Sequence, residues 1–135
     1  MPKVCVIDDD CGSTRALSKI FTSLNGFEVC AEIETVDEAV KEVGSRSPDL
    51  IMVGLPLPND TLAQFVSNLK KLAPNTNIFL LIRKCNSVVE KQALSVGITA
   101  VFSKFDDYEG LILNAEALFN PKLVTKAKAK TNSLQ

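Results

Sequence analysis

The chain has 135 residues, which suits one domain and is too short for two separate hydrophobic cores. Hydrophobic residues make up 46% and charged residues 23% of it, a balance that excludes disordered and fibrous classes. No apolar run approaches the roughly 20 residues of a membrane span, and no secretory signal is visible, so we expect a cytoplasmic protein that does not contact membranes. The net charge of −1 argues against a general nucleic-acid surface. The absence of histidine excludes Ser-His-Asp and Cys-His triads and a histidine phosphocarrier.

Five short apolar runs alternate with amphipathic stretches along the chain. A run that is continuously apolar, rather than alternating, is typical of a strand covered on both faces. Five such βα units predict an α/β protein with a doubly wound, five-stranded parallel sheet in three layers. The expected strands are residues 3–7, 27–33, 50–53, 78–82 and 100–103.

Capping residues mark where the helices between these strands should begin. Thr35 and Ser87 each open a capping box, completed by Glu38 and Glu90. The first helix is expected to begin at Ser13, and the last at a cap formed by Asp106 or Asp107. The helices should end at Asn25-Gly26, Ser47-Pro48, Pro74, Gly97 and about Phe119.

A change in composition divides the chain into a folded part, residues 1–119, and a basic polar tail, residues 120–135. The tail contains four lysines and no acid, so 11 of the 15 bases and all 16 acids belong to the folded part. The charges are therefore about −5 and +4. We interpret the tail as a solvated extension or truncated linker, with contact to phosphates or an acidic partner as the alternative.

The predicted carboxyl ends of the strands define the candidate site, because loops at these ends form the sites of doubly wound sheets. They carry Asp8-Asp9-Asp10, Gly54, Ile82-Arg83 and Ser103-Lys104. Three consecutive aspartates repel one another unless a cation or an ammonium group is near. They could hold Mg²⁺, form an ion pair with Lys104, or cap the following helix. The residues alone leave these alternatives open.

The four cysteines, Cys5, Cys11, Cys30 and Cys85, include no C-x-x-C pair of the kind found in zinc and redox sites. Cys5 and Cys30 lie inside apolar runs and are expected to act as small buried hydrophobes. A reducing compartment suits this pattern.

In order and spacing, these features resemble the response-regulator receiver family, the phosphoacceptor half of two-component signalling. The resemblance covers residues 3 to about 119 and implies a flavodoxin-like (βα)5 sandwich. It places Asp8 and Asp9 at the metal-binding positions and Lys104 at the pocket lysine. The runs Ser47–Val53 and Ala93–Ala100 and the loop proline Pro58 also match.

The departures from the family pattern fall on its functional positions. Gly54 occupies the position of the phosphoacceptor aspartate, and a glycine cannot form an acyl phosphate. Ile82 and Arg83 replace the hydroxyl residue and the small residue that follows it. Val101 replaces the aromatic switch residue, and Phe105 replaces the proline after the lysine. Mg²⁺ binding should be weakened and is not required, since only two of three carboxylates remain.

We therefore expect a degenerate receiver, or pseudo-receiver, that is not an enzyme and acts through protein contacts independently of phosphorylation. The resemblance implies a partner surface at about residues 87–97, 100–103 and 107–119, with a second copy of the chain as one partner.

One alternative is phosphorylation of Asp8, Asp9 or Asp10. Another is the regulatory domain of a transcriptional regulator whose DNA-binding domain lies outside this chain. A third, a flavin-type phosphate loop, is disfavoured by the three acids. No helix-turn-helix pattern predicts DNA binding by these residues.

Overall fold

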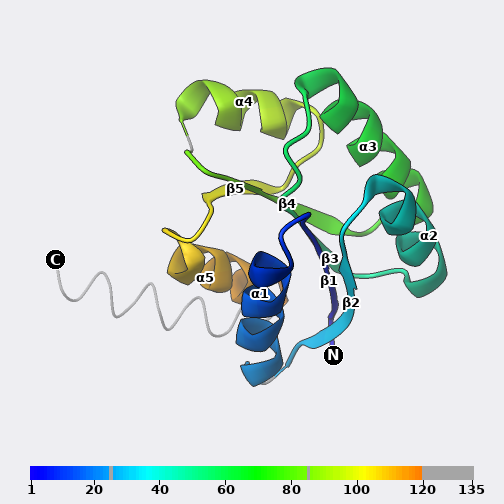
Figure 1. Ribbon diagram of the computed structural model, residues 1–135, viewed down its shortest axis with the longest axis vertical. Helices are drawn as coiled ribbons and strands as arrows, with labels where there is room; N and C mark the ends of the chain where they lie inside the picture. The colour runs from blue at the N-terminus through cyan, green and yellow to red at the C-terminus, as the bar shows by residue number, and fades with distance from the viewer. Residues whose placement is uncertain (25, 85, 120–135) are drawn as a thin grey trace, which may run out of the picture.

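The protein is an open parallel sheet covered by helices on both faces (Figure 1). The computed structural model describes residues 1–24, 26–84 and 86–119. Its strands run parallel in the order β2-β1-β3-β4-β5, which confirms the predicted five-stranded architecture. The strands are β1 (Lys3–Ile7), β2 (Glu28–Ile33), β3 (Leu50–Val53), β4 (Asn77–Ile82) and β5 (Ala100–Ser103).

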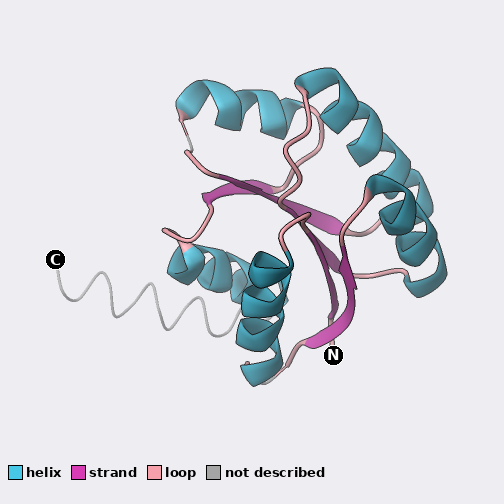
Figure 2. Cartoon of the chain, viewed as in Figure 1, coloured by secondary structure: helices cyan, strands magenta, loops and turns pink. Residues whose placement is uncertain are grey.

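Five helices alternate with the strands and form the two outer layers (Figure 2). Helices α1 and α5 cover one face of the sheet, and α2, α3 and α4 cover the other (Figure 1). The helices are α1 (Cys11–Ser23), α2 (Val36–Arg46), α3 (Asn59–Leu72), α4 (Ser87–Ser95) and α5 (Tyr108–Phe119). None of the helices in the described part of the chain combines the length and apolarity that crossing a bilayer demands.

The continuous apolarity of the central strands follows from the two cores. Side chains alternate along a strand, so Val4 and Leu50 point into the core under α1 and α5. Cys5 and Ile51 point into the opposite core, under α2, α3 and α4. All four residues of β3 are buried. A strand with two covered faces therefore has no polar position, as predicted.

The start of α2 agrees with the sequence prediction, whereas the starts of α1 and α4 differ from it. Thr35 caps α2 as expected, because its Oγ1 accepts a hydrogen bond from the Glu38 backbone N–H at 3.2 Å. The prediction that Ser13 opens the first helix is wrong, since α1 begins at Cys11 and Asp10 is its N-cap. Asn86, rather than Ser87, caps α4. In both cases an earlier Asp or Asn, an equally good capping residue, takes the role from serine.

Other element ends lie close to their predicted positions. Asp107 accepts the first intrahelical bond of α5, from the Leu111 N–H at 3.1 Å, so α5 begins after the second of the two candidate aspartates. The second strand begins at Glu28, one residue later than predicted, and Phe27 packs edge-on against Phe21 in the core. Asn25, Cys85 and residues 120–135 lie outside the described residues, so the predicted tail is not described.

Candidate functional site

The carboxyl ends of the parallel strands meet at one edge of the sheet, as the sequence predicts. Their backbone hydrogen bonds lock neighbouring ends together. The Gly54 N–H donates to the Ile7 carbonyl at 2.7 Å, and the Lys104 N–H donates to the Ile82 carbonyl at 2.6 Å. The Asp8 N–H donates to the Ile33 carbonyl at 2.9 Å. The predicted site residues Asp8, Gly54, Ile82 and Lys104 are therefore brought together.

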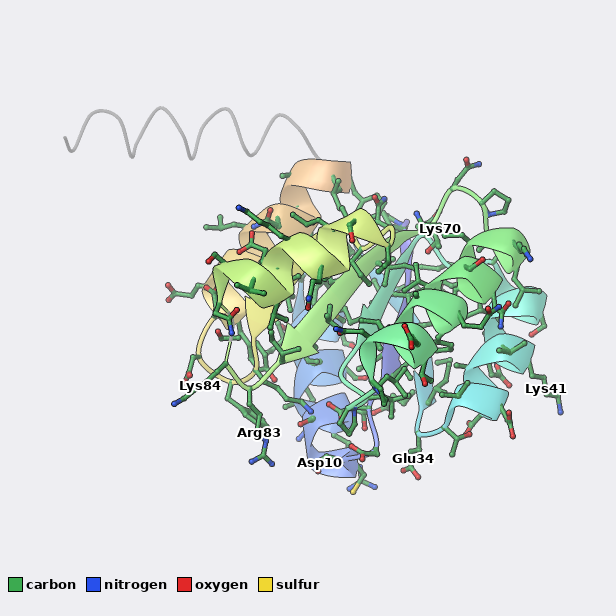
Figure 3. The ribbon with its side chains drawn as sticks, turned by 90° about the horizontal axis from the view of Figure 1, so that it is seen from above. Asp10, Glu34, Lys41, Lys70, Arg83 and Lys84 are labelled. Atoms are coloured by element: carbon green, nitrogen blue, oxygen red, sulfur yellow. The ribbon has the colours of Figure 1, made fainter. Side chains whose placement is uncertain are left out.

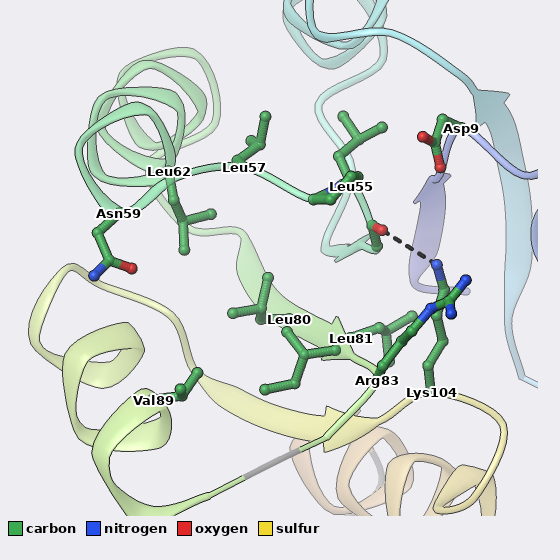
Figure 4. Close-up of a pocket in the computed structure, with 13 residues that line it drawn as sticks. Asp9, Leu55, Leu57, Asn59, Leu62, Leu80, Leu81, Arg83, Val89 and Lys104 are labelled. Carbon is green, nitrogen blue, oxygen red and sulfur yellow. Dashed lines mark hydrogen bonds between the residues drawn. The ribbon is translucent and has the colours of Figure 1, made fainter.

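A buried ion pair lies at the centre of this edge. Lys104 Nζ lies 2.7 Å from Asp8 Oδ2, and the Asp8 side chain is completely buried. The same ammonium group donates to the Gly54 carbonyl at 3.2 Å (Figure 4). Asp8 Oδ1 accepts a hydrogen bond from the Asp10 N–H at 3.0 Å. The carboxylate and the ammonium group therefore neutralise each other inside the protein.

The three consecutive aspartates have three different environments. Asp8 is buried in the ion pair with Lys104. Asp9 is exposed and lines the adjoining cavity. Asp10 caps α1 through its Oδ1, which accepts from the Gly12 N–H at 2.9 Å. Two of the alternatives open at the sequence level, ion pairing and helix capping, are thus both realised, by different residues.

Gly54 has no room for a side chain. A Cβ atom built on it would collide with Asp8 Oδ2, and would lie 3.0 Å from Asp8 Cγ and 3.3 Å from Lys104 Cε. In the sheet, β1 and β5 are separated by β3 and β4. The Lys104 side chain crosses this distance over Gly54, in the space that an acceptor side chain would fill (Figure 4). The ion pair therefore depends on the absence of a side chain at Gly54.

The donor set fits Mg²⁺ poorly. The ion prefers several oxygen ligands in near-ideal octahedral geometry, usually one or two carboxylates together with phosphate oxygens and water. Here the Asp8 carboxylate already contacts an ammonium group, and Asp9 offers the free carboxylate at the cavity. Within residues 1–24, 26–84 and 86–119, no three acidic or cysteine side chains converge to hold a metal.

The other predicted site residues are Ile82, Arg83, Val101 and Phe105, and the first two border the same cavity as Lys104. Ile82 and Arg83 both line the cavity, the first half-buried and the second exposed. Val101 is half-buried and lies opposite Leu80 of β4 in the sheet register. Phe105 is 59% exposed and adopts a left-handed backbone, with φ of 69°. An L-residue with a side chain pays roughly 1–2 kcal/mol for this conformation.

A cavity of about 500 Å³ opens beside the ion pair, between the β3–α3 loop, the end of β4 and the start of α4 (Figure 4). Its wall is largely apolar, and Arg83 reaches from the end of β4 toward Lys104 at its rim. Viewed from above, Asp10, Glu34, Arg83 and Lys84 project at this edge, so its charges are mixed (Figure 3). Its apolar lining residues are Leu55, Pro56, Leu57, Leu62, Leu80, Leu81, Ile82 and Val89.

Sequence reasoning did not identify this apolar wall. Leu55 and Leu57 alternate with Pro56 and Pro58 in the β3–α3 loop, and two leucines in so short a loop were the available signal. Nothing in the spacing of Leu62 or Val89 along the sequence indicates a cavity. Tyr108 was also missed. Burial raises its pKa, and its ring lies 6.2 Å from that of Phe105.

Comparison with known proteins gives the class of the chain. The family model for the response regulator receiver domain matches residues 4–115. The chain therefore belongs to the response regulator receiver family. It is a receiver domain of the two-component type.

Individual relatives agree with this class. The uncharacterized transcriptional regulatory protein YhcZ of Bacillus subtilis is 26% identical over 110 residues, which are 82% of this chain and 51% of that protein. Curated relatives are longer than the chain, which spans 56%, 29% and 51% of the lengths of three of them.

Solved structures show the same fold. A two-component response regulator of the LuxR family from Aurantimonas sp. superposes with a TM-score of 0.78 at 17% identity, covering 98% of this chain and 99% of that chain. The CheX–CheY–BeF3–Mg²⁺ complex from Borrelia burgdorferi contains a chain with a TM-score of 0.74 at 20% identity, covering 87% of this chain and 88% of the other.

Proposed function

We propose that this receiver domain is a pseudo-receiver, a regulatory module that works through protein contacts without being phosphorylated. The observation that carries the proposal is the Asp8–Lys104 ion pair over Gly54, with Nζ and Oδ2 at 2.7 Å. Phosphoryl transfer to a receiver needs a carboxylate nucleophile. Here the position that supplies it holds glycine, and the space is occupied by groups that satisfy each other.

The expected relay for a phosphoryl signal is also missing. Ile82 offers no hydroxyl at the end of β4, where the family uses one to contact the phosphoryl oxygens. Val101, on the neighbouring strand, has a small branched side chain with few rotamers and no ring to move between two packed positions. Gly54, Ile82 and Val101 each lack the side chain that the family uses at that position. Because all three positions are altered together, they support the loss of the whole phosphorylation switch. The proposal assigns no catalytic residue.

The proposed partner surface consists of α4, β5 and α5. Large apolar side chains are exposed here, which favours protein contacts over solvent. Val88 and Leu94 of α4 are 63% and 44% exposed, and Leu113 and Leu118 of α5 are 55% and 40% exposed. Along α4, only Ala93 is buried. We propose that this surface binds a protein, with a second copy of the chain as an alternative outcome of the test.

The length of the relatives supports a wider setting for the module. YhcZ is about twice as long as the part that this chain matches, and its name describes a transcriptional regulatory protein. We propose that the domain regulates an effector domain of this kind in the cytoplasm, without itself contacting nucleic acid.

Phosphorylation of another aspartate is disfavoured by the geometry. Asp8 is buried against Lys104, and Asp10 accepts the capping hydrogen bond of α1. Asp9 is exposed and lines the cavity, so it is the acceptor that this alternative would use.

Intact mass after incubation with Mg²⁺ and acetyl phosphate tests the proposal. We expect no phosphoryl adduct on the wild-type chain. A stoichiometric, base-labile adduct would refute the pseudo-receiver function. The variant Asp9→Asn then locates the acceptor, because loss of the adduct in this variant assigns phosphorylation to Asp9.

A further inference from the structure

Two cysteines of neighbouring strands lie in contact. Cys5 belongs to β1 and Cys30 to β2, and their Sγ atoms are 3.2 Å apart. The sheet register is irregular at this point: Val4 pairs with Val29, but Cys5 pairs with Ala31. Cys30 is therefore an extra residue in β2, and the irregularity leaves its side chain beside that of Cys5.

The separation suits a cross-link. Adjacent strands lie about 4.8 Å apart, within the range of Cα distances that a disulfide spans. The sulfurs need to approach by about 1.2 Å to reach a bond length of about 2.05 Å. Side-chain rotation supplies a movement of this size, so the two strands can keep their pairing.

The two thiols differ in accessibility. Cys5 is completely buried, whereas Cys30 is half-buried on the edge strand of the sheet. Burial raises the pKa of the Cys5 thiol, and the hydrogen bond and charge of Cys30 raise it further. An oxidant from solvent therefore reacts first with Cys30, and Cys5 reacts in the second step.

We propose that Cys5 and Cys30 form a reversible disulfide, a redox modification site outside the receiver pocket. With glutathione disulfide as the oxidant, the Cys30 thiolate attacks one sulfur and releases one glutathione thiolate. The Cys5 thiol then loses its proton as its sulfur attacks Cys30 Sγ, and the second glutathione thiolate is released. Two protein thiols are oxidised, one glutathione disulfide is reduced to two glutathiones, and the two thiol protons pass to solvent or to the leaving thiolates.

The cross-link would fix an edge of the sheet close to the candidate site. It closes a loop between positions 25 residues apart and ties β2 to β1. Three residues after Cys5, the same strand leads into Asp8. This inference goes beyond the proposed function and does not depend on it, because neither sulfur takes part in the pocket.

Equilibration of the native protein with reduced and oxidised glutathione tests the proposal. We expect the intact mass to fall by two hydrogen atoms, and peptide mapping without reductant to join the peptides of Cys5 and Cys30. The thermal midpoint should rise by several degrees, since the closed loop restricts the unfolded chain. Reductant should reverse all three changes.

Matched variants separate this cross-link from general thiol oxidation. Cys30→Ser should abolish the intramolecular bond, and Cys11→Ser, which removes an exposed cysteine, should leave it unchanged. A stable glutathione adduct on Cys30 with Cys5 still free would overturn the proposal. So would a wild-type chain in which Cys5 and Cys30 both stay free after equilibration with oxidised glutathione.

Discussion

Replacement of Gly54 by alanine should destabilise the fold, although it adds only one methyl group. The Cβ would collide with Asp8 Oδ2 and lie 3.3 Å from Lys104 Cε. The Asp8 carboxylate cannot move freely, because the Asp10 N–H holds one oxygen at 3.0 Å and Lys104 holds the other at 2.7 Å. The methyl group must therefore separate the ion pair or shift the backbone.

The magnitude follows from these two outcomes. Overpacking a tight site costs typically about 1–3 kcal/mol, and uncoupling a buried ion pair costs about 3–5 kcal/mol. We expect Gly54→Ala to lower the free energy of unfolding by about 3 kcal/mol, measured by urea denaturation with an unchanged m-value.

Gly44→Ala is the matched control. Gly44 lies exposed within α2, and a Cβ there would lie 3.5 Å from Leu72 Cδ2, an ordinary contact. Alanine in a helix interior should raise stability by about 0.5–1 kcal/mol. If Gly54→Ala were as stable as the wild type, the tight packing of the ion pair against Gly54 would be wrong.

Other predictions follow from the same contacts. Lys104→Met should lower the free energy of unfolding by about 3–5 kcal/mol, because it leaves the buried Asp8 carboxylate unpaired; a loss below about 1 kcal/mol in urea would contradict this. Asn86→Ala should cost about 1 kcal/mol in the same assay and Ser87→Ala clearly less, since Asn86 caps α4; equal losses would count against this cap. Tyr108, the single tyrosine, should ionise above its ordinary pKa of about 10 in an absorbance titration, because burial disfavours the phenolate. Stability should therefore fall as the pH rises above about 10, where the unfolded chain loses this proton first; a normal or lowered pKa would exclude a desolvated phenol.

The fold was largely predictable because two covered faces leave a strand no polar position. The run Leu50–Val53 was identified without error, and β1 and β5 likewise. Helix starts were less certain because capping is a competition among nearby residues. Asp10 and Asn86 each precede the serine that the pattern favoured, and they cap α1 and α4. Such local choices depend on loop geometry, which spacing does not encode.

The site was predictable where topology alone decides it. Parallel strands bring their carboxyl ends to one edge, so Asp8 and Lys104 could be expected to meet. The role of Gly54 needed the structure. Its missing side chain lets Lys104 reach past two strands, and its carbonyl accepts from the same ammonium group. The contact between Cys5 and Cys30 depends on an irregular register that apolar runs do not reveal.

Amide NMR shifts with beryllium fluoride and Mg²⁺ test the central claim most directly, since this phosphoryl mimic needs no covalent transfer. Gly54 offers the mimic no carboxylate, Ile82 offers it no hydroxyl, and the Asp8 carboxylate is paired with Lys104. We predict that the amides of Gly54, Ile82 and Lys104 keep their positions. Saturable shifts of these three amides would show that the pocket still senses a phosphoryl group, and would contradict the account.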